Sequence, residues 1–167
     1  MAEATKQSSR WSLFRVPESA GAIYGTIAAM AVIAGTAKDP AHGKALELTI
    51  ATLLVFWLAH VYAHALAHHL RGARRLDWSA VRAAMAEEWS MLQGPVPLLV
   101  LLVLGELGVL EERQAVRLAL WLGVVELVTW ATLYARRQRW SWFTALTAGA
   151  VNGLFGLVIV VLEVVVH

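Results

Sequence analysis

Long apolar runs, separated by short polar segments, make up most of this 167-residue chain. A helix that spans a bilayer needs roughly 17 to 25 mostly apolar residues. Runs of that kind lie at about residues 19–36, 45–70, 94–110, 115–135 and 142–166. Because backbone groups in lipid must be hydrogen-bonded within the segment, each run is predicted to be a helix. The pattern predicts an all-α polytopic integral membrane protein: an N-terminal tail, residues 1–16, and one five-helix transmembrane domain, residues 17–167.

A shorter segment between the second and third runs has a different pattern. Its apolar residues recur at helical spacing, opposite charged residues that include Arg82 and Glu87. Asp77 is a suitable N-cap, because its side chain can accept a backbone N–H of the first turn. We therefore predict an amphipathic helix over about 77–92 that lies on the cytoplasmic membrane surface. Trp78 and Trp89 would then belong to the aromatic belt at that surface.

Composition agrees with lipid as the solvent for most of the chain. Hydrophobic residues make up 59% of the sequence and charged residues only 16%, whereas soluble domains carry about 25% charged residues. The absence of cysteine excludes disulfides, thiolate metal sites and cysteine nucleophiles. The net charge of +2 is small, and no basic patch is interleaved with aromatic residues, so no nucleic-acid partner is predicted.

Lysine and arginine are distributed unequally between the two sides of the predicted bundle. Ten lie on the side of the N-terminus and four on the other side. The positive-inside rule then places the N-terminus in the cytoplasm and the C-terminus outside, across the plasma membrane. The ten are Lys6, Arg10, Arg15, Arg71, Arg74, Arg75, Arg82, Arg136, Arg137 and Arg139; the four are Lys38, Lys44, Arg113 and Arg117.

The first run has an alternative interpretation as a cleaved signal peptide. It follows a basic segment and contains small residues, Gly35-Thr-Ala37, that resemble a cleavage site. The run is somewhat long for that role. Its Gly21-x-x-x-Gly25 spacing is better suited to close packing of one helix on another, as is Gly105-Glu-Leu-Gly108.

Three histidines, His60, His64 and His68, follow one another at four-residue intervals in the second run. Each step turns a helix by about 400°, so the imidazoles form one stripe that rises about 6 Å per step. Neutral imidazole binds transition metals well. One helix seldom completes a metal site, so a further ligand such as Glu126 would be needed, and haem ligation would need a facing helix. A transition metal or haem is therefore one interpretation of the stripe, and it needs ligands from another helix.

Carboxylates and an amide occupy the other predicted helices at different depths. Glu126 and Asn152 lie near the centres of their runs, and Glu106 and Glu47 lie toward the outer side. No lysine or arginine lies within the apolar cores to pair with them. A carboxylate buried without a cation takes a proton or binds a cation. With histidine, which changes charge near physiological pH, these groups predict a polar column for protons or small metal cations.

Each of these residues also has a purely structural interpretation. His68, close to Arg71, would be part of an interfacial polar cap, to which His64 could also belong. His60 and the carboxyls of Glu106 and Glu126 would form hydrogen bonds between helices. Asn152, beside Gly153, would be polarity at a helix contact.

Three interpretations of function remain on this sequence, and we predict no enzyme. No nucleophile elbow, zinc-protease motif, P-loop or dinucleotide fingerprint is present. The first hypothesis is a channel or carrier for protons or small metal cations. The second is an accessory or scaffold subunit of a larger membrane complex, with a redox module that holds haem or a metal as a third interpretation. Because five short helices leave little room for a pore of their own, we expect a homo-oligomer or a larger complex in the bilayer.

Overall fold

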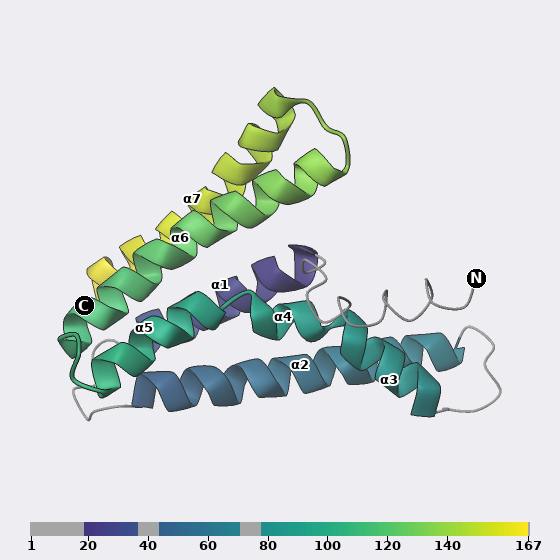
Figure 1. Ribbon diagram of the computed structural model, residues 1–167, viewed down its shortest axis with the longest axis horizontal. Coiled ribbons are helices and arrows are strands. Elements are labelled where there is room, and N and C mark those ends of the chain that lie inside the picture. Colours follow the sequence, from purple (N-terminus) through teal and green to yellow (C-terminus); the bar gives the residue numbers. More distant parts are fainter. Residues whose placement is uncertain (1–18, 37–43, 71–77, 167) are drawn as a thin grey trace, which may run out of the picture.

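The computed structural model describes residues 19–36, 44–70 and 78–166, apart from the side chains of residues 19, 68–70, 80 and 166. Helices make up 91% of these residues and none of them is in a strand, which confirms the all-α prediction. Figure 1 shows the helices in chain order. They are α1 (Ser19–Thr36), α2 (Lys44–Leu70), α3 (Trp78–Glu87), α4 (Trp89–Gln93), α5 (Val96–Glu106), α6 (Glu112–Arg137) and α7 (Trp142–Val166).

Some of the sequence predictions fall outside the described residues. They are the N-terminal tail, the Asp77 cap, the side chain of His68, and the positions of Lys38 and of the arginines between α2 and α3. The interpretation of the histidine stripe therefore rests on His60 and His64.

Three helices are long and apolar enough to cross a membrane: α2 over Lys44–Ala67, α6, and α7 over Trp142–Val165. A fourth crossing results if Val81–Gln93 and Val96–Glu106, which meet at an angle of 54°, form one bent span. The apolar part of α1, Ala20–Thr36, is shorter than these. Three to four such helices indicate a membrane protein, whereas the predicted five spans are not confirmed.

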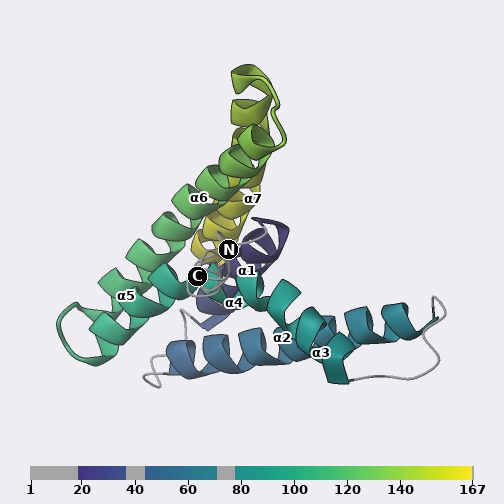
Figure 2. The ribbon, with the colours of Figure 1, turned by 45° about the vertical axis from the view of Figure 1, so that its right-hand side comes forward.

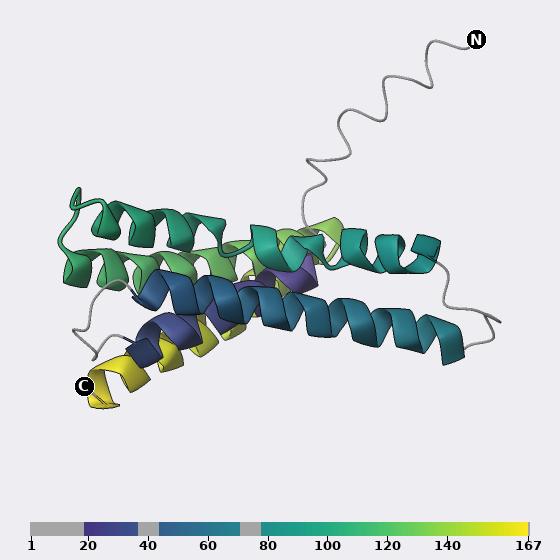
Figure 3. The same cartoon turned by 90° about the horizontal axis from the view of Figure 1, so that it is seen from below.

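The first helix lies at the centre of the molecule, where it contacts α2, α4, α6 and α7. Its buried Ala29, Met30 and Ile33 join the main core with Leu98 of α5 and Leu120 of α6. Figure 1 and Figure 2 show the α6–α7 hairpin and the α2–α3 pair diverging from this centre as two arms. Within each of the pairs α1–α2 and α6–α7 the two helices run in opposite directions, as Figure 3 also shows.

The predicted third span, 94–110, contains a helix of only 11 residues, α5. Its length of about 17 Å is well short of a hydrocarbon core of about 30 Å. The helix ends in a Schellman motif, in which the N–H of Val109 donates to Leu104 and that of Gly108 to Gly105. Gly108 takes a φ of 70°, and a Cβ there would meet nothing within 4 Å. Gly108 is therefore a turn residue, and the prediction that it packs against another helix was wrong.

The predicted surface helix over 77–92 is divided in the structure. Backbone helix geometry breaks at Glu88, between α3 and the short α4. Ala84 of α3 packs against Trp57 and Val61 of α2. These three residues form a second buried cluster beside the main core. The segment therefore lies along the C-terminal half of α2, as Figure 3 shows, where the sequence predicted a separate helix on the surface.

Candidate functional site

Glu126 lies in the middle of α6, on the side that meets α1. Its carboxylate is half-buried and accepts a long hydrogen bond, 3.4 Å, from the hydroxyl of Thr26, a fully buried residue of α1. Within the described part of the chain, no lysine, arginine or histidine forms an ion pair with this carboxylate. The polar partner of Glu126 is thus a neutral hydroxyl.

A glycine one turn earlier in α6 brings α1 within reach of Glu126. A Cβ added to Gly123 would lie 2.5 Å from the sulfur of Met30, which is itself one turn beyond Thr26. The two helices can approach closely here because Gly123 has no side chain. Leu127 beside Glu126 is fully buried, so the carboxylate adjoins a closely packed part of the helix contact.

A break in the helical backbone lies on another side of α1. Pro95 and Pro97 have no N–H, so the carbonyls of Met91 and Gln93 lose the donors that a continuous helix would supply. The N–H of Gly94 still donates to the carbonyl of Ser90, and α4 ends at Gln93. Freed backbone carbonyls are costly in lipid, and they occur in membrane proteins where other protein covers them or where they line a site.

Two glycines of α1 cover this break. A Cβ on Gly25 would overlap the carbonyl oxygen of Met91, and one on Gly21 would overlap the hydroxyl of Ser90. The expectation that Gly21-x-x-x-Gly25 serves close helix packing is confirmed, and its partner is α4. Ser90 is buried, and its hydroxyl has no hydrogen-bond partner among the described residues. A single helix, α1, therefore contacts both the backbone break and the Glu126 carboxylate.

His64 joins α2 to the end of α3. Its Nδ1 lies 2.9 Å from a carboxylate oxygen of Glu88, and its Nε2 lies 3.4 Å from one of Glu87. The Glu88 carboxylate is mostly covered, at 16% exposed, whereas Glu87 and His64 are each about half exposed. His64 is within one turn of Ala67, where the apolar span of α2 ends. We call His64, Glu87 and Glu88 the histidine clamp.

His60 does not share in this arrangement, although it lies on the same face of α2. Its Nδ1 lies 2.9 Å from the carbonyl of Phe56 and donates to it, and its ring stacks on the ring of Phe56. The Nδ1 of His60 is thus satisfied within its own helix. Of the two described histidines, His64 is the one that reaches another helix.

An aromatic pair lies between the clamp and the backbone break. Trp57 of α2 meets Trp89 of α4 edge to face, with ring centres 6.3 Å apart. Trp57 is near the middle of the α2 span, so Trp89 lies deeper than the interfacial position that the sequence predicted. The indole N–H of Trp57 is buried without a hydrogen-bond partner in the described structure.

The remaining predicted site residues lie apart from Glu126 and from the histidine clamp. The amide of Asn152 donates to the carbonyl of Ala148 in its own helix, α7. Glu47 is exposed near the start of α2. Glu106 and Glu112 line a small cleft where α2, α5 and α6 meet.

The structure therefore does not join the predicted polar groups into one column. No hydrogen bond or ion pair connects His60 or His64 with Glu126, Glu106 or Asn152 in the ranges described. The same residues contain no group of three histidine, aspartate or glutamate side chains arranged to hold a metal ion. The metal set His60, His64 and His68 stays a prediction, because the side chain of His68 is outside the description.

Several residues of these sites were not expected as participants. In the sequence, Glu87 and Glu88 lie on the charged face of the predicted amphipathic helix. No pattern distinguishes Thr26 or Ser90 from other small residues. One signal was available, the sequence Gly94-Pro-Val-Pro97 directly after a helical segment. Two prolines at that spacing favour a broken helix, and broken helices often mark sites in transporters.

Comparison of this chain with protein-family models, with curated proteins and with solved structures gives no match. The argument about function therefore rests on the residues and on their geometry.

Proposed function

We propose that this protein carries protons across the plasma membrane, with Glu126 as the central protonatable group. The observation that supports this most directly is the Glu126 carboxylate, half-buried on a spanning helix with a hydroxyl as its polar partner. Ionisable residues inside spanning helices are costly and mark proton or ion pathways by default. Protons are preferred over metal cations because the described residues contain no group of three histidine, aspartate or glutamate side chains arranged to hold a metal ion.

The chemistry at Glu126 is a reversible protonation. In the ionised form the Thr26 hydroxyl donates to the carboxylate, and in the protonated form the carboxyl O–H can donate to the Thr26 oxygen. One hydroxyl therefore serves both states by rotating. A cationic partner would hold the carboxylate ionised and would stop the cycle.

The helix that holds Thr26 also covers the backbone break, which gives the carrier a movable part. Its Gly21 and Gly25 adjoin the Ser90 side chain and the Met91 carbonyl, directly before the break at Pro95. A small shift of α1 or of α4–α5 would change the access of Glu126 from one side to the other. Broken helices at the substrate site are a recurrent device in secondary transporters.

The proposed route has a polar group near each end. The histidine clamp lies on the predicted cytoplasmic side and the cleft with Glu106 and Glu112 on the other. Because these groups do not touch Glu126, proton transfer between them requires bridging water. Under the predicted topology, with the N-terminus in the cytoplasm, His64 would exchange protons with the cell interior.

The proposal is tested with the purified full chain in liposomes that contain a pH-sensitive dye. A potassium gradient with valinomycin drives proton uptake. We expect wild-type protein to raise proton flux above that of empty liposomes, and Glu126→Gln to lower it by about tenfold or more, because glutamine keeps the shape and the Thr26 contact but cannot release a proton. Thr26→Val should cause a smaller loss.

The matched control is Glu111→Gln, the same chemical change at an exposed carboxylate in front of α6. Its flux should equal that of the wild type. No flux in the wild type, or full flux in Glu126→Gln, contradicts the proposal. A silent wild type that co-purifies with a stoichiometric partner would instead favour the accessory-subunit interpretation, and an absorption band of haem or a bound metal would favour the redox interpretation.

A further inference from the structure

The turn between α6 and α7 places an arginine in a backbone conformation that favours glycine. Arg139 has a φ of 61°. It is the left-handed residue of a second Schellman motif, in which its N–H donates to Arg136 and that of Trp140 donates to Ala135. Residues other than glycine rarely adopt this backbone conformation. A non-glycine residue found there points to a role for its side chain.

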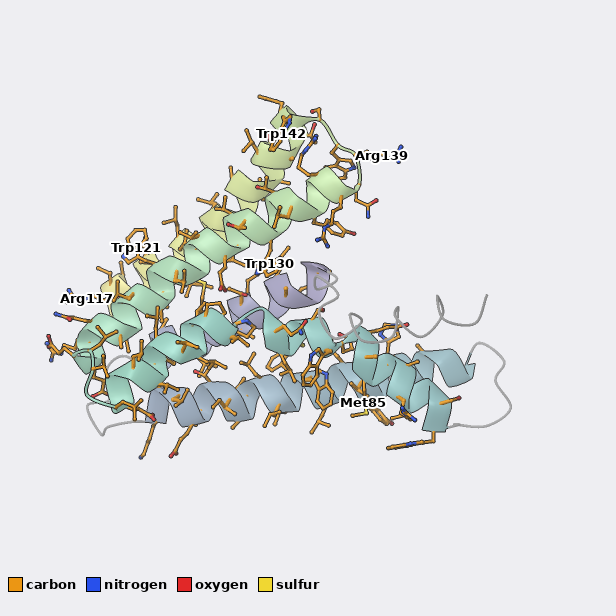
Figure 4. The ribbon with its side chains drawn as sticks, viewed as in Figure 1. Met85, Arg117, Trp121, Trp130, Arg139 and Trp142 are labelled. Atoms are coloured by element: carbon orange, nitrogen blue, oxygen red, sulfur yellow. The ribbon has the colours of Figure 1, made fainter. Side chains whose placement is uncertain are left out.

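Two guanidinium groups of the turn are free to bind a ligand. Arg137 and Arg139 are exposed, and neither guanidinium group forms a hydrogen bond or ion pair with the described residues. The nearest carboxylates along the chain are Glu126 and Glu163, so no acidic residue lies in the sequence from 127 to 162. Figure 4 shows Arg139 pointing outward at the tip of the hairpin.

The third arginine of the turn is held by an aromatic ring. The guanidinium carbon of Arg136 lies 4.3 Å from the ring centre of Trp142, and an Nη atom donates to the carbonyl of Trp140. Arg136 thereby fixes Trp142 beside the free arginines. Trp140, Trp142 and Phe143 expose 48%, 63% and 82% of their surface. Cationic and aromatic groups thus share one small surface.

We propose that the α6–α7 turn binds the phosphate headgroup of an anionic phospholipid. Guanidinium groups recognise phosphate oxygens bidentately, which assigns Arg137 and Arg139 to the headgroup. Trp140, Trp142 and Phe143 contact the boundary between headgroups and acyl chains, where aromatic side chains concentrate. The absence of acidic residues from this stretch of sequence selects an anionic lipid over a zwitterionic one. The site is independent of proton transport, because it lies at the tip of the hairpin, away from Glu126.

The experiment measures lipid binding to the purified full chain by native mass spectrometry. Phosphatidylglycerol and phosphatidylcholine are titrated separately. The wild type should bind phosphatidylglycerol about tenfold more tightly, and Arg137→Gln/Arg139→Gln should lose at least that preference, because each arginine near an anionic surface contributes about fivefold to affinity. Inorganic phosphate at millimolar concentration should not displace the lipid, since it lacks the apolar contacts.

The matched control is Arg113→Gln/Arg117→Gln at the other end of α6. It removes the same charge beside another exposed tryptophan, Trp121. Its lipid affinity should stay within about twofold of the wild type, since Glu111 and Glu112 adjoin these arginines. A second variant, Arg137→Gln/Arg139→Gly, relieves the positive-φ arginine and so separates a lost lipid site from a lost fold.

Four results would overturn the proposal. They are equal binding of the two lipids by the wild type, unchanged phosphatidylglycerol affinity in both turn variants, an equal loss in the control, and displacement of the lipid by inorganic phosphate. The last result would show that the turn recognises phosphate without a lipid.

Discussion

In the α6–α7 hairpin, glycines let two long helices meet almost backbone to backbone, whereas α2 and α3 meet through larger side chains and a polar clamp. A Cβ on Gly149 would overlap the hydroxyl of Thr132 and lie 3.0 Å from the carbonyl of Val128. Gly153 and Gly156 face α6 in the same way. Between α2 and α3, the contact consists of Trp57, Val61 and Ala84, with His64 bound to Glu88.

The difference indicates which arm can move. Close glycine contacts are short-ranged and are lost at once when helices separate, so the α6–α7 hairpin is a rigid unit. Aromatic and aliphatic contacts tolerate small shifts, and the α2–α3 pair is followed by breaks at Glu88 and at Pro95. We therefore expect α3 to move relative to the bundle while α6 and α7 remain together.

The largest effect should come from filling the glycine contact. Gly149→Val places two methyl groups against Thr132 and the backbone of α6, so the free energy of unfolding in neutral detergent should fall by about 3 kcal/mol. Denaturation with sodium dodecyl sulfate measures this change. Gly35→Val is the control, because a Cβ there meets nothing within 4 Å. Equal stability of the two variants would show that the hairpin is not held by close approach.

The two turns that border α6 sharpen the contrast within the rigid arm. Both are Schellman motifs, with Gly108 in the left-handed position before α6 and Arg139 in the one after it. Arg139→Gly should raise the free energy of unfolding by about 1 kcal/mol, and Gly108→Ala should lower it by a similar amount, because a Cβ in this conformation costs about that much. The same denaturation assay, without anionic lipid, measures both. Changes of the same sign would refute the assignment.

The sequence was sufficient to predict the helices and the approximate ends of several of them. The predicted spans 19–36 and 142–166 match α1 and α7, because apolar length and the polar residues that bound it determine where helices form in lipid. The role of Gly21 and Gly25 also followed from their spacing. The break at Glu88 did not, because no proline or glycine marks that position.

The sites could be predicted only in part, since they depend on how the helices are rotated about their axes. Glu126 was recognised by its isolation in an apolar run, but its partner Thr26 is 100 residues away. His60 and His64 are equivalent in the sequence pattern. They differ in the structure because only His64 faces carboxylates, and that contact depends on the placement of α3.

The smallest effect should come from opening the histidine clamp. Glu88→Gln weakens the contact of α3 with His64 and should destabilise α3 by about 0.5 kcal/mol, the usual value for a partly exposed hydrogen-bonded pair. Hydrogen exchange of the backbone amides in 78–87 should accelerate about twofold, while those of α6 and α7 stay unchanged. Glu87→Gln should change exchange less, because its contact with His64 is longer and more exposed. In the background of His64→Ala, Glu88→Gln should add nothing further. Faster exchange throughout α6 and α7 would mean that the two arms are coupled, and the contrast between them would then fail.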